Sequence, residues 1–183
     1  MGKSTKLILA NALKNLMKDM QLSKISVSDI TESCNLNRQT FYYHFTDKYK
    51  LVNWIFDREI LDNVENYLNY EHWSKALEKV FSLVESDSGF YLNALRDNFS
   101  YFYIHLMRTQ RNILDEFIEN LLEGRRMKKS DREFFSDFYT NAFVGTFVSW
   151  VTSSMHEPAE TVVTRLEKLI RGSLKNVLED YIR

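Results

Sequence analysis

Residues 38–45, with the sequence RQTFYYHF, concentrate hydrogen-bonding side chains in one short segment. If the segment is a helix, Phe41 and Phe45 are four residues apart and share a face, so we expect them to pack inward. The remaining faces then carry polar side chains, namely Arg38, Gln39, Thr40, Tyr42, Tyr43 and His44. Arginine and glutamine can read base edges, and hydroxyl and imidazole groups can bond phosphate oxygens. An alternative is that Tyr42 and Tyr43 only cover the core edge, with their hydroxyls in water.

Two short helices joined by a tight turn would present these side chains. Ser26 is a good N-cap for a helix over about residues 27–34, with Asp29 at the capping-box position. Asn37 is a good N-cap for the helix that carries residues 38–45. Two capped helices separated by residues 35–37 match the helix-turn-helix pattern.

Two lysines stand where the next helix begins. Lys48 and Lys50 fall in its first turn, where the positive end of the helix dipole disfavours cations. A nearby phosphate would reverse that argument, because helix N-termini attract anions. The alternative is that both side chains extend into solvent.

The charge of the chain is unevenly distributed. Residues 1–50 carry eight Lys and Arg against four Asp and Glu, a net +4. Residues 51–183 carry sixteen against twenty-one, a net −5, so the whole chain has a net charge of −1. A basic first part suggests an anionic partner for that part alone. The single cysteine, Cys34, and the absence of a long apolar run favour a cytoplasmic protein.

The rest of the 183-residue chain has the pattern of successive helices, since it contains one proline and five glycines. Apolar spacing predicts helices over residues 4–20, 47–68, 73–86, 89–97, 99–123, 130–155 and 158–182. Gly124 suits the end of the 99–123 helix, and Pro158 suits the first position of the last one. We expect an all-α protein of about nine helices, divided into residues 1–50 and a larger helical domain over residues 51–183.

The stretch ISVSDITESCNLNRQTFYYHFTDKYKL, residues 25–51, resembles the N-terminal DNA-binding domain of TetR-type transcriptional regulators. The positions that fit in register are Val27, Ile30, Cys34, Leu36, Asn37, Thr40, Phe41, Tyr42, Phe45, Asp47, Lys48 and Leu51. Cys34 and Asn35 depart from the alanine and glycine that are usual in the family, and asparagine tolerates a left-handed turn. The stretches from NYLNYEHW and FVGTFVSW onward look like the C-terminal domain of a Firmicutes branch, the DhaS-like regulators.

The resemblance implies a homodimer on a near-palindromic operator in double-stranded DNA, with a recognition helix from each subunit in successive major grooves. Arg38 and Gln39 would read bases, with Tyr43 as a third reader. The phosphate contacts would come from Ser26, Ser28, Thr40, Tyr42, His44 and Lys48, beside the N-cap Asn37.

The last two helices of each subunit would form a four-helix bundle, with Ala142, Gly145, Ser149, Leu166 and Ile170 at the interface. Small residues at spacings of three and four support close helix approach there, because Gly145 inside a helix costs up to about 1 kcal/mol relative to alanine. The alternative is that these small residues pack within their own subunit.

Control by an effector is a further expectation. His105 and Arg108 could orient an anionic small molecule among aromatic residues that include Tyr103 and Phe138. An aromatic stripe at helical spacing is, however, also the pattern of an ordinary core. The basic segment RRMKKSDR, Arg125 to Arg132, reads as a solvated loop, with a protein or anion partner as the alternative.

No cofactor, metal or catalytic site is expected. The four histidines are scattered without a second ligand at metal-site spacing, and no nucleotide-binding or catalytic motif occurs. The family default is a repressor, and a DhaS-like activator that works with a co-activator protein is the variant. The rival outside this class is a helical protein-interaction module that has lost DNA binding.

Overall fold

The structure, a computed structural model, describes residues 2–64 and 72–181. This part of the chain is helical and contains no strand, which confirms the all-α expectation. The elements in chain order are α1 Gly2–Leu16, the 3₁₀ helix η1 Leu22–Lys24, α2 Val27–Ser33, α3 Arg38–His44, α4 Lys48–Val64, α5 Trp73–Ser86, α6 Ser88–Asp97, α7 Phe99–Leu122, α8 Lys129–Thr152 and α9 Ala159–Tyr181.

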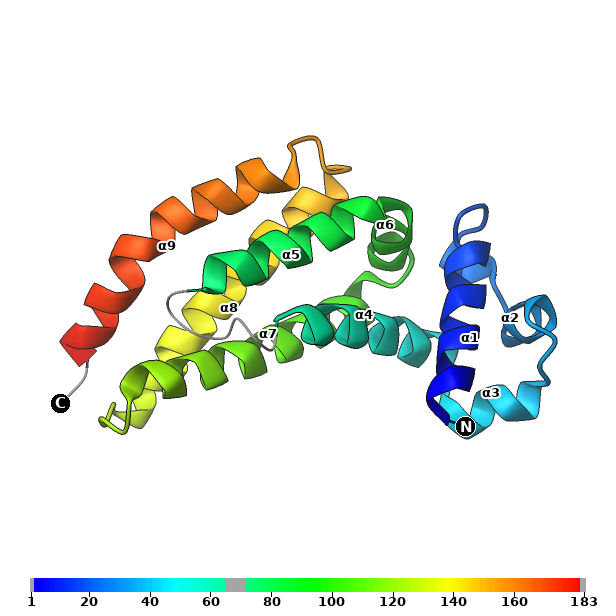
Figure 1. The fold of residues 1–183 in the computed structure, drawn as a ribbon, viewed down its shortest axis with the longest axis horizontal. Helices are drawn as coiled ribbons and strands as arrows, with labels where there is room; N and C mark the ends of the chain where they lie inside the picture. Colours follow the sequence, from blue (N-terminus) through cyan, green and yellow to red (C-terminus); the bar gives the residue numbers. More distant parts are fainter. Residues whose placement is uncertain (1, 65–71, 182–183) are drawn as a thin grey trace.

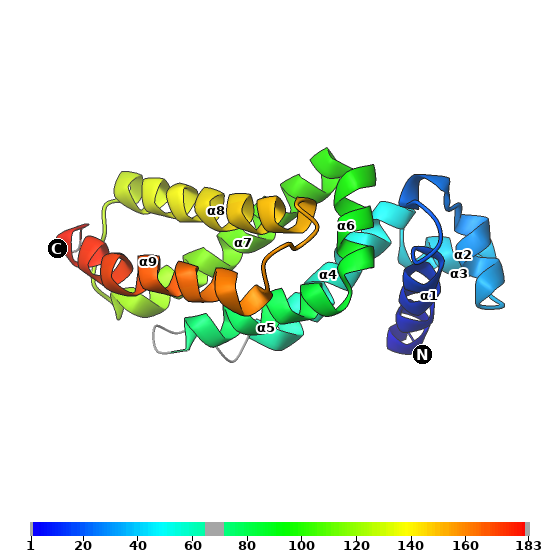
Figure 2. The ribbon, with the colours of Figure 1, turned by 90° about the horizontal axis from the view of Figure 1, so that it is seen from above.

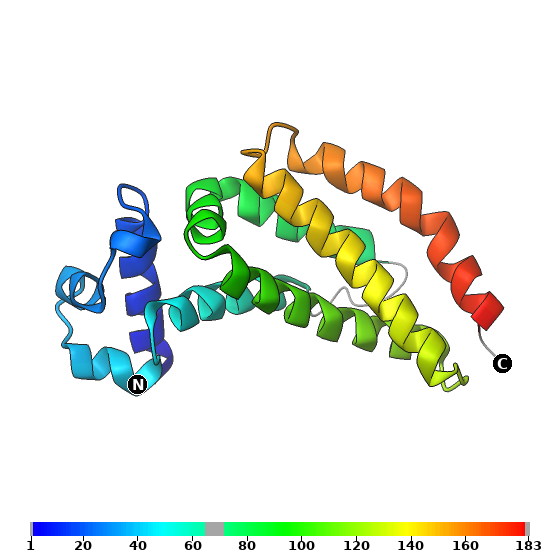
Figure 3. The ribbon, with the colours of Figure 1, turned by 180° about the vertical axis from the view of Figure 1, so that it is seen from behind.

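The molecule is elongated, with α1, α2 and α3 gathered at one end (Figure 1). Helices α5 to α9 build the other end, and α4 leads from the small end into the large one (Figure 1). Seen from above and from behind, α7 and α8 run side by side, while α9 lies along α5 (Figures 2 and 3). Because α4 packs on α1 as well as on α5 and α7, it belongs to the core of both ends.

Helix ends agree with the sequence expectations in most places. Gly124 has a φ of +82° just past α7, and Asn35 has a φ of +54° in the turn after α2. The expected position of Pro158 is wrong by one residue, because α9 begins at Ala159 and Pro158 precedes it. Helix α1 ends at Leu16 rather than at residue 20, and η1 was not expected. The part of the fourth helix expected beyond residue 64, and residue 182 of the last helix, lie outside the described residues.

Hydrogen bonds connect α6 with the small end of the molecule, the end that contains α1, α2 and α3. The Asn93 side chain accepts a hydrogen bond from the Leu22 amide at 2.9 Å and donates to the Met17 and Met20 carbonyls at 3.1 and 2.7 Å. One turn later, the Asp97 carboxylate accepts from the Ser23 amide at 2.7 Å. Helix α6 therefore satisfies backbone groups that the end of α1 leaves open.

A second joint connects α1 with α4 through an ion pair. The Lys14 ammonium lies 2.5 Å from Glu59 of α4 and 2.5 Å from Asp87, the residue before α6. The Tyr91 hydroxyl donates to the other oxygen of Glu59 at 2.6 Å. Burial lowers the pKa of Lys14, but the bonds to Asp87 and Glu59 outweigh it and raise the pKa above its ordinary value. Lys14 therefore stays charged at neutral pH and holds α1 against the larger end.

None of the described helices is long and apolar enough to cross a membrane.

Candidate nucleic-acid interface

The turn between α2 and α3 is built by side chains that cap both helices. Ser26 Oγ accepts from the Asp29 amide at 3.2 Å, and the Asp29 carboxylate accepts from the Ser26 amide at 2.7 Å. This capping box confirms the expected start of α2. Asn37 Oδ1 accepts from the Thr40 amide at 2.7 Å and so starts α3 where the sequence predicted.

Helix α3 divides into an inward and an outward face. Phe41 is 0% exposed and Phe45 6%, and Phe45 packs edge-on against Trp54 of α4. On the outward face Tyr42 is 50% exposed and Tyr43 84%. A tyrosine that only covers a core edge would bury most of its ring, so these values favour a surface that meets a partner. Arg38 and Gln39 are exposed at the start of the helix, on its solvent side.

A phosphate oxygen only accepts hydrogen bonds, so a hydroxyl can bind it only with a hydrogen that is not already bonded within the protein. The hydroxyl groups of α2 and α3 differ in this respect. Thr40 Oγ1 already donates to Asn37 Oδ1 at 2.9 Å, so its hydrogen is engaged. Ser26 Oγ accepts a bond from the Asp29 amide, and the Ser26 hydroxyl also bonds the Asp29 carboxylate, so its hydrogen is engaged within the capping box. Ser28 lies half-buried in the first turn of α2, and half-buried His44 packs edge-on against Tyr43, with ring centroids 4.9 Å apart.

Lys48 departs from the expected phosphate contact. Its Nζ donates to the carbonyl oxygens of Leu22, Ser23 and Ile25, at 2.7, 3.1 and 2.6 Å. These bonds occupy all three hydrogens of the ammonium, so Lys48 ties the start of α4 to η1 instead of reaching outward. Burial lowers the pKa of Lys48, against the opposing influence of Asp97 and Asp29.

Lys50 is the exposed lysine of the same turn. Its Nζ lies 5.5 Å from the ring centroid of Tyr101 on α7, and a hydrogen bond to Tyr101 raises the pKa of Lys50. The Asp47 carboxylate accepts from the Lys50 amide at 2.8 Å, so an anion offsets the dipole at this helix start. Sequence reasoning missed Tyr101, because nothing local links residues so far apart in the chain.

An apolar groove lies between α8 and α9. The groove has a volume of about 550 Å³ and is lined by residues of both helices, including Ala142, Leu166 and Ile170. Three large apolar side chains along these helices are exposed: Phe134 is 69%, Phe138 59% and Leu169 73% exposed. These three were missed as interface candidates, although Phe134 and Phe138 are four residues apart and share a face.

The expected interface residues fall into two groups. Ala142, Gly145 and Ser149 are exposed along α8, and a Cβ on Gly145 would meet nothing within 4 Å. Packing inside the subunit therefore does not explain this glycine. Leu166 and Ile170 are only 8% and 7% exposed, since they pack mainly against their own subunit.

The structure does not bring the expected effector residues together. Phe138 lies at the groove, and Tyr103 stacks on Phe99 at 5.4 Å. His105 Nε2 lies 2.7 Å from an Asp57 oxygen, a bond between α7 and α4, while Arg108 is exposed. Neither described cavity is lined by all four of these residues, so an effector site built from them stays a prediction.

A cavity of about 120 Å³ lies elsewhere in the larger end. Its walls come from α4, α5, α7, α8 and α9 and consist mostly of aliphatic and aromatic side chains. Among the described residues that line it, only Trp73, Thr109 and Gln110 can form hydrogen bonds through their side chains, and none is charged.

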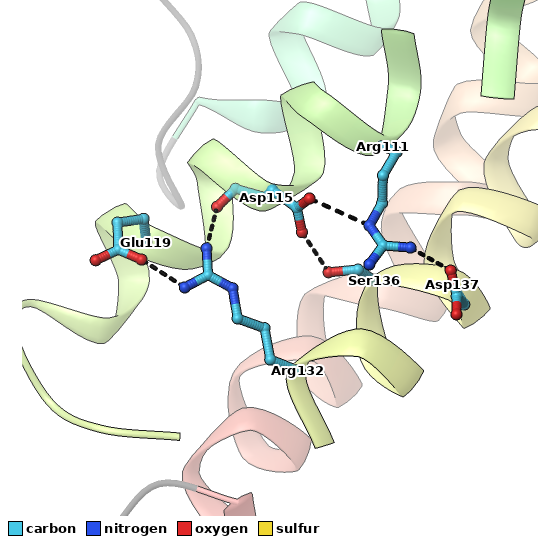
Figure 4. A network of polar contacts seen from close by, with 6 residues as sticks. All are labelled: Arg111, Asp115, Glu119, Arg132, Ser136 and Asp137. Carbon is cyan, nitrogen blue, oxygen red and sulfur yellow. Dashed lines mark hydrogen bonds and ion pairs between the residues drawn. The ribbon is translucent and has the colours of Figure 1, made fainter. Parts of the chain in front are cut away.

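Ion pairs hold α7 against α8 (Figure 4). Arg111 contacts Asp115 at 3.1 Å and also pairs with Asp137 of α8. Buried Ser136 donates to Asp115 at 2.6 Å, and Arg132 donates to Glu119 at 2.7 Å (Figure 4).

The basic segment is a solvated loop in its first half, because residues 125–128 lie between α7 and α8 and Arg125, Arg126 and Lys128 are exposed. Arg132 is engaged with α7, and Arg125 donates to the carbonyls of Leu121 and Leu122, both at 3.2 Å. Residues 129–132 already belong to α8.

Two family models match the chain. The model described as bacterial regulatory proteins, tetR family, matches residues 9–55, and the one described as transcriptional regulator C-terminal region matches residues 71–172. The chain belongs to the TetR family, whose members are transcriptional regulators and not enzymes.

Individual relatives agree with this assignment. The HTH-type dhaKLM operon transcriptional activator DhaS of Lactococcus lactis subsp. lactis (strain IL1403) is 28% identical over 171 residues, covering 92% of this chain and 81% of that protein. A solved structure of the dihydroxyacetone kinase operon activator DhaS has a TM-score of 0.73 at 21% identity and covers 98% of each chain. The TetR family repressor AlkX from Dietzia sp. strain DQ12-45-1b has a TM-score of 0.53 at 17% identity, covering 94% of this chain and 96% of that one. The two structures share the fold with this chain.

Proposed function

We propose that this TetR-family regulator binds a specific operator through the outward face of α3. The observation that carries the proposal is the division of this helix, with Phe41 and Phe45 buried and Arg38, Gln39, Tyr42 and Tyr43 turned to solvent. Arg38 and Gln39 are assigned to base edges, and Tyr43 to a third base contact. A module that had lost DNA binding would have no reason to keep large, polar side chains exposed at these positions.

The phosphate contacts are assigned to side chains that can still donate. Tyr42 has an exposed ring and hydroxyl, with Ser28 on α2 and His44 on α3 as further donors, and Ser26 can reach a phosphate only by turning its hydroxyl away from Asp29. Thr40 can reach a phosphate only by turning its hydroxyl away from Asn37. Lys50 takes the place of Lys48, since Lys50 is exposed and Lys48 is internally bonded.

We further propose that the protein acts as a homodimer through α8 and α9. Exposed Phe134, Phe138 and Leu169 would be covered by a second copy, and Gly145 would allow the two α8 helices to approach closely. A dimer places two copies of α3 about 34 Å apart, one turn of DNA, on a near-palindromic operator.

For the direction of regulation, we propose activation. The 28% identical relative is named a transcriptional activator, and the match extends over 92% of this chain. Deleting the gene should then lower expression of the operon it controls. Raised expression after deletion would mean that the protein is a repressor.

The experiment that tests DNA binding is a fluorescence-anisotropy titration. The probes are DNA from upstream of the protein's own gene and a scrambled duplex, each at two salt concentrations. Specific binding predicts affinity at least about a thousandfold tighter for the operator, falling steeply with salt. An Arg38→Ala variant should lose this preference, whereas Arg126→Ala, which removes the same charge from an exposed position beyond α7, should keep it. Equal weak binding of both probes, repeated in genome-wide site selection, would contradict the proposal.

A further inference from the structure

The first turn of α7 lies beside the first turn of α4, next to the proposed DNA-binding face. Half-buried Tyr101 of α7 packs on Tyr49 of α4, with ring centroids 6.1 Å apart. The ammonium of exposed Lys50 lies 5.5 Å from the centroid of the same Tyr101 ring and bonds its hydroxyl. Only residues 45–47 separate α3 from α4, so a side chain of the larger end lies at the border of the proposed DNA contact.

Arg108 adds a second cation at this border. Tyr101 and Arg108 are seven residues apart, so they share a face of α7 and are about 10 Å apart along its axis. The Arg108 guanidinium is close enough to Lys50 to oppose the rise in the pKa of Lys50. Arg108 is exposed and forms no hydrogen bond or ion pair with a described residue. Neighbouring cations of this kind repel each other, and an anion bound between them would offset the repulsion.

The Tyr101 hydroxyl can bond in two directions at once. Its oxygen accepts from Lys50, since an ammonium only donates, and its own hydrogen is bonded to no described residue. The ammonium of Lys50 has three hydrogens and uses one of them for Tyr101. Lys50, Tyr101 and Arg108 therefore present hydrogen-bond donors, two of which are charged, and this is the combination that binds a phosphate group.

We propose that Tyr101 and Arg108 of α7 bind the DNA backbone together with Lys50, so that the larger end of the molecule contacts phosphates beside the bases read by α3. This inference rests on the proposed function, and it adds two residues of α7 to an interface assigned so far to α2, α3 and the start of α4. Phosphate contacts do not depend on the base sequence. The two residues therefore contribute to affinity for any duplex and to the position of the DNA, and not to the choice of operator.

Arg108→Gln should make DNA binding less dependent on salt. Each neutralised phosphate contributes roughly 0.9 to the slope of log K against log salt concentration, so the slope should become shallower by about 0.9 for each bound copy. Anisotropy titrations of the full chain over a series of salt concentrations, with the operator and with a scrambled duplex, measure this slope. Arg126→Gln is the control, because it removes the same charge from an exposed position after α7, at the end of the molecule opposite α3 (Figure 1).

Tyr101→Phe keeps the ring against Tyr49 and removes only the hydroxyl. It should weaken binding to the operator and to the scrambled duplex by the same factor, about tenfold for each bound copy, because a donor to a charged phosphate is lost. Tyr103→Phe is the matched control. It removes the same atom from a half-buried ring of α7 that stacks on Phe99, and it should bind like the unaltered chain. The Tm of each variant without DNA shows that it is folded.

The proposal is overturned if Arg108→Gln has the salt slope of Arg126→Gln. It is also overturned if Tyr101→Phe binds DNA like Tyr103→Phe, or if the loss in either variant is confined to the operator.

Failure of the proposed function would give a different result, in which the unaltered chain binds the operator and the scrambled duplex equally. Non-specific binding also depends on phosphate contacts, so the scrambled duplex would still measure the effect of both variants. If the unaltered chain bound neither duplex, both proposals would be overturned together.

Discussion

The side chains of α3 divide the work of a DNA contact by their chemistry. Arg38 and Gln39 carry planar groups that can make paired bonds to a base edge, whereas a tyrosine hydroxyl offers one donor. Tyr43 is 84% exposed, so its ring is not needed to close the core, whereas half-exposed Tyr42 packs edge-on against Phe41 and leaves its hydroxyl side to solvent. Changes at these positions should therefore affect binding more than folding.

Replacing Tyr42 with phenylalanine should weaken binding to every DNA sequence by a similar factor. The change removes one hydroxyl donor to a phosphate, worth about 1.5 kcal/mol or roughly tenfold in affinity. Titrations of the operator and of several base-substituted operators would measure the factor for each. A loss confined to one operator variant would instead make Tyr42 a base reader.

Arg38→Ala should relax specificity at one or two operator positions. A bidentate contact to a base contributes about 1–3 kcal/mol of discrimination, which the shorter side chain cannot supply. Binding-site selection with the variant should show degenerate bases at those positions, while the other positions remain unchanged. Selection of the original operator with full preference would remove Arg38 from the base readers.

At the scale of elements, two kinds of hydrogen bond fix the position of α3: caps within the DNA-binding end, and bonds between that end and α6. Local caps set where α2 and α3 begin, and α6 sets how α1 and η1 lie against the larger end. The first kind could be predicted from sequence, because Ser26, Asp29 and Asn37 act within three residues of their partners. The second could not, because Asn93 and Leu22 lie 71 positions apart.

The same distinction applies to the rest of the candidate site. The inward packing of Phe41 and Phe45 follows from their spacing on one helix, so the sequence alone predicts the exposed face of α3. The internal hydrogen bonds of Lys48 could not be predicted from the sequence, since its carbonyl partners are 23 to 26 residues away. The cavity escaped it too, because apolar residues that line a cavity and those that fill a core have the same periodicity.

Asn93→Ala should reduce both stability and DNA affinity, although the residue is remote from α3. The change leaves the Leu22 amide and the carbonyls of Met17 and Met20 without partners, at a cost of about 1–3 kcal/mol in unfolding free energy. Denaturant unfolding measures the first effect and anisotropy titration the second. The control is Asn112→Ala, at an exposed position of α7. Equal DNA affinity of the two folded variants would show that α6 does not orient the DNA-binding end.

The capping box of α2 should make stability depend on acidity. The bonds from Ser26 lower the pKa of Asp29 below its ordinary value of 3.8, so the folded chain retains the carboxylate more strongly than the unfolded one. Its stabilising contribution is complete above that ordinary pKa and is lost as the pH falls through the lowered value. Asp29→Asn should therefore have a lower Tm than the unaltered chain at pH 7, and the difference should shrink below pH 3.8. A constant difference across this range would exclude the carboxylate as its cause.

At the scale of the whole molecule, the exposed apolar side chains of α8 and α9 make self-association depend on concentration. Leu169→Glu should weaken dimer association at least about tenfold, because the second copy would exclude water from this interface and leave the new charge without a partner. Sedimentation velocity over a dilution series would measure the dissociation constant. Ile104→Glu is the matched control, since Ile104 is 60% exposed on α7 and Leu169 73% on α9. If both variants associate like the unaltered chain, the interface lies elsewhere.

The sharing of α4 between the two ends has a consequence for recombining regulators. Helix α4 packs on α1 as well as on α5 and α7, so it connects the DNA-binding end to the remainder as a packed helix and not as a flexible linker. A chimera that exchanges only residues 1–47 would separate Lys14 from Glu59 and Leu22 from Asn93. Such a hybrid would lose these contacts unless Glu59 of α4 and Asn93 of α6 were exchanged together with residues 1–47. The natural unit of exchange is thus a set of residues scattered over nearly a hundred positions, rather than a contiguous segment.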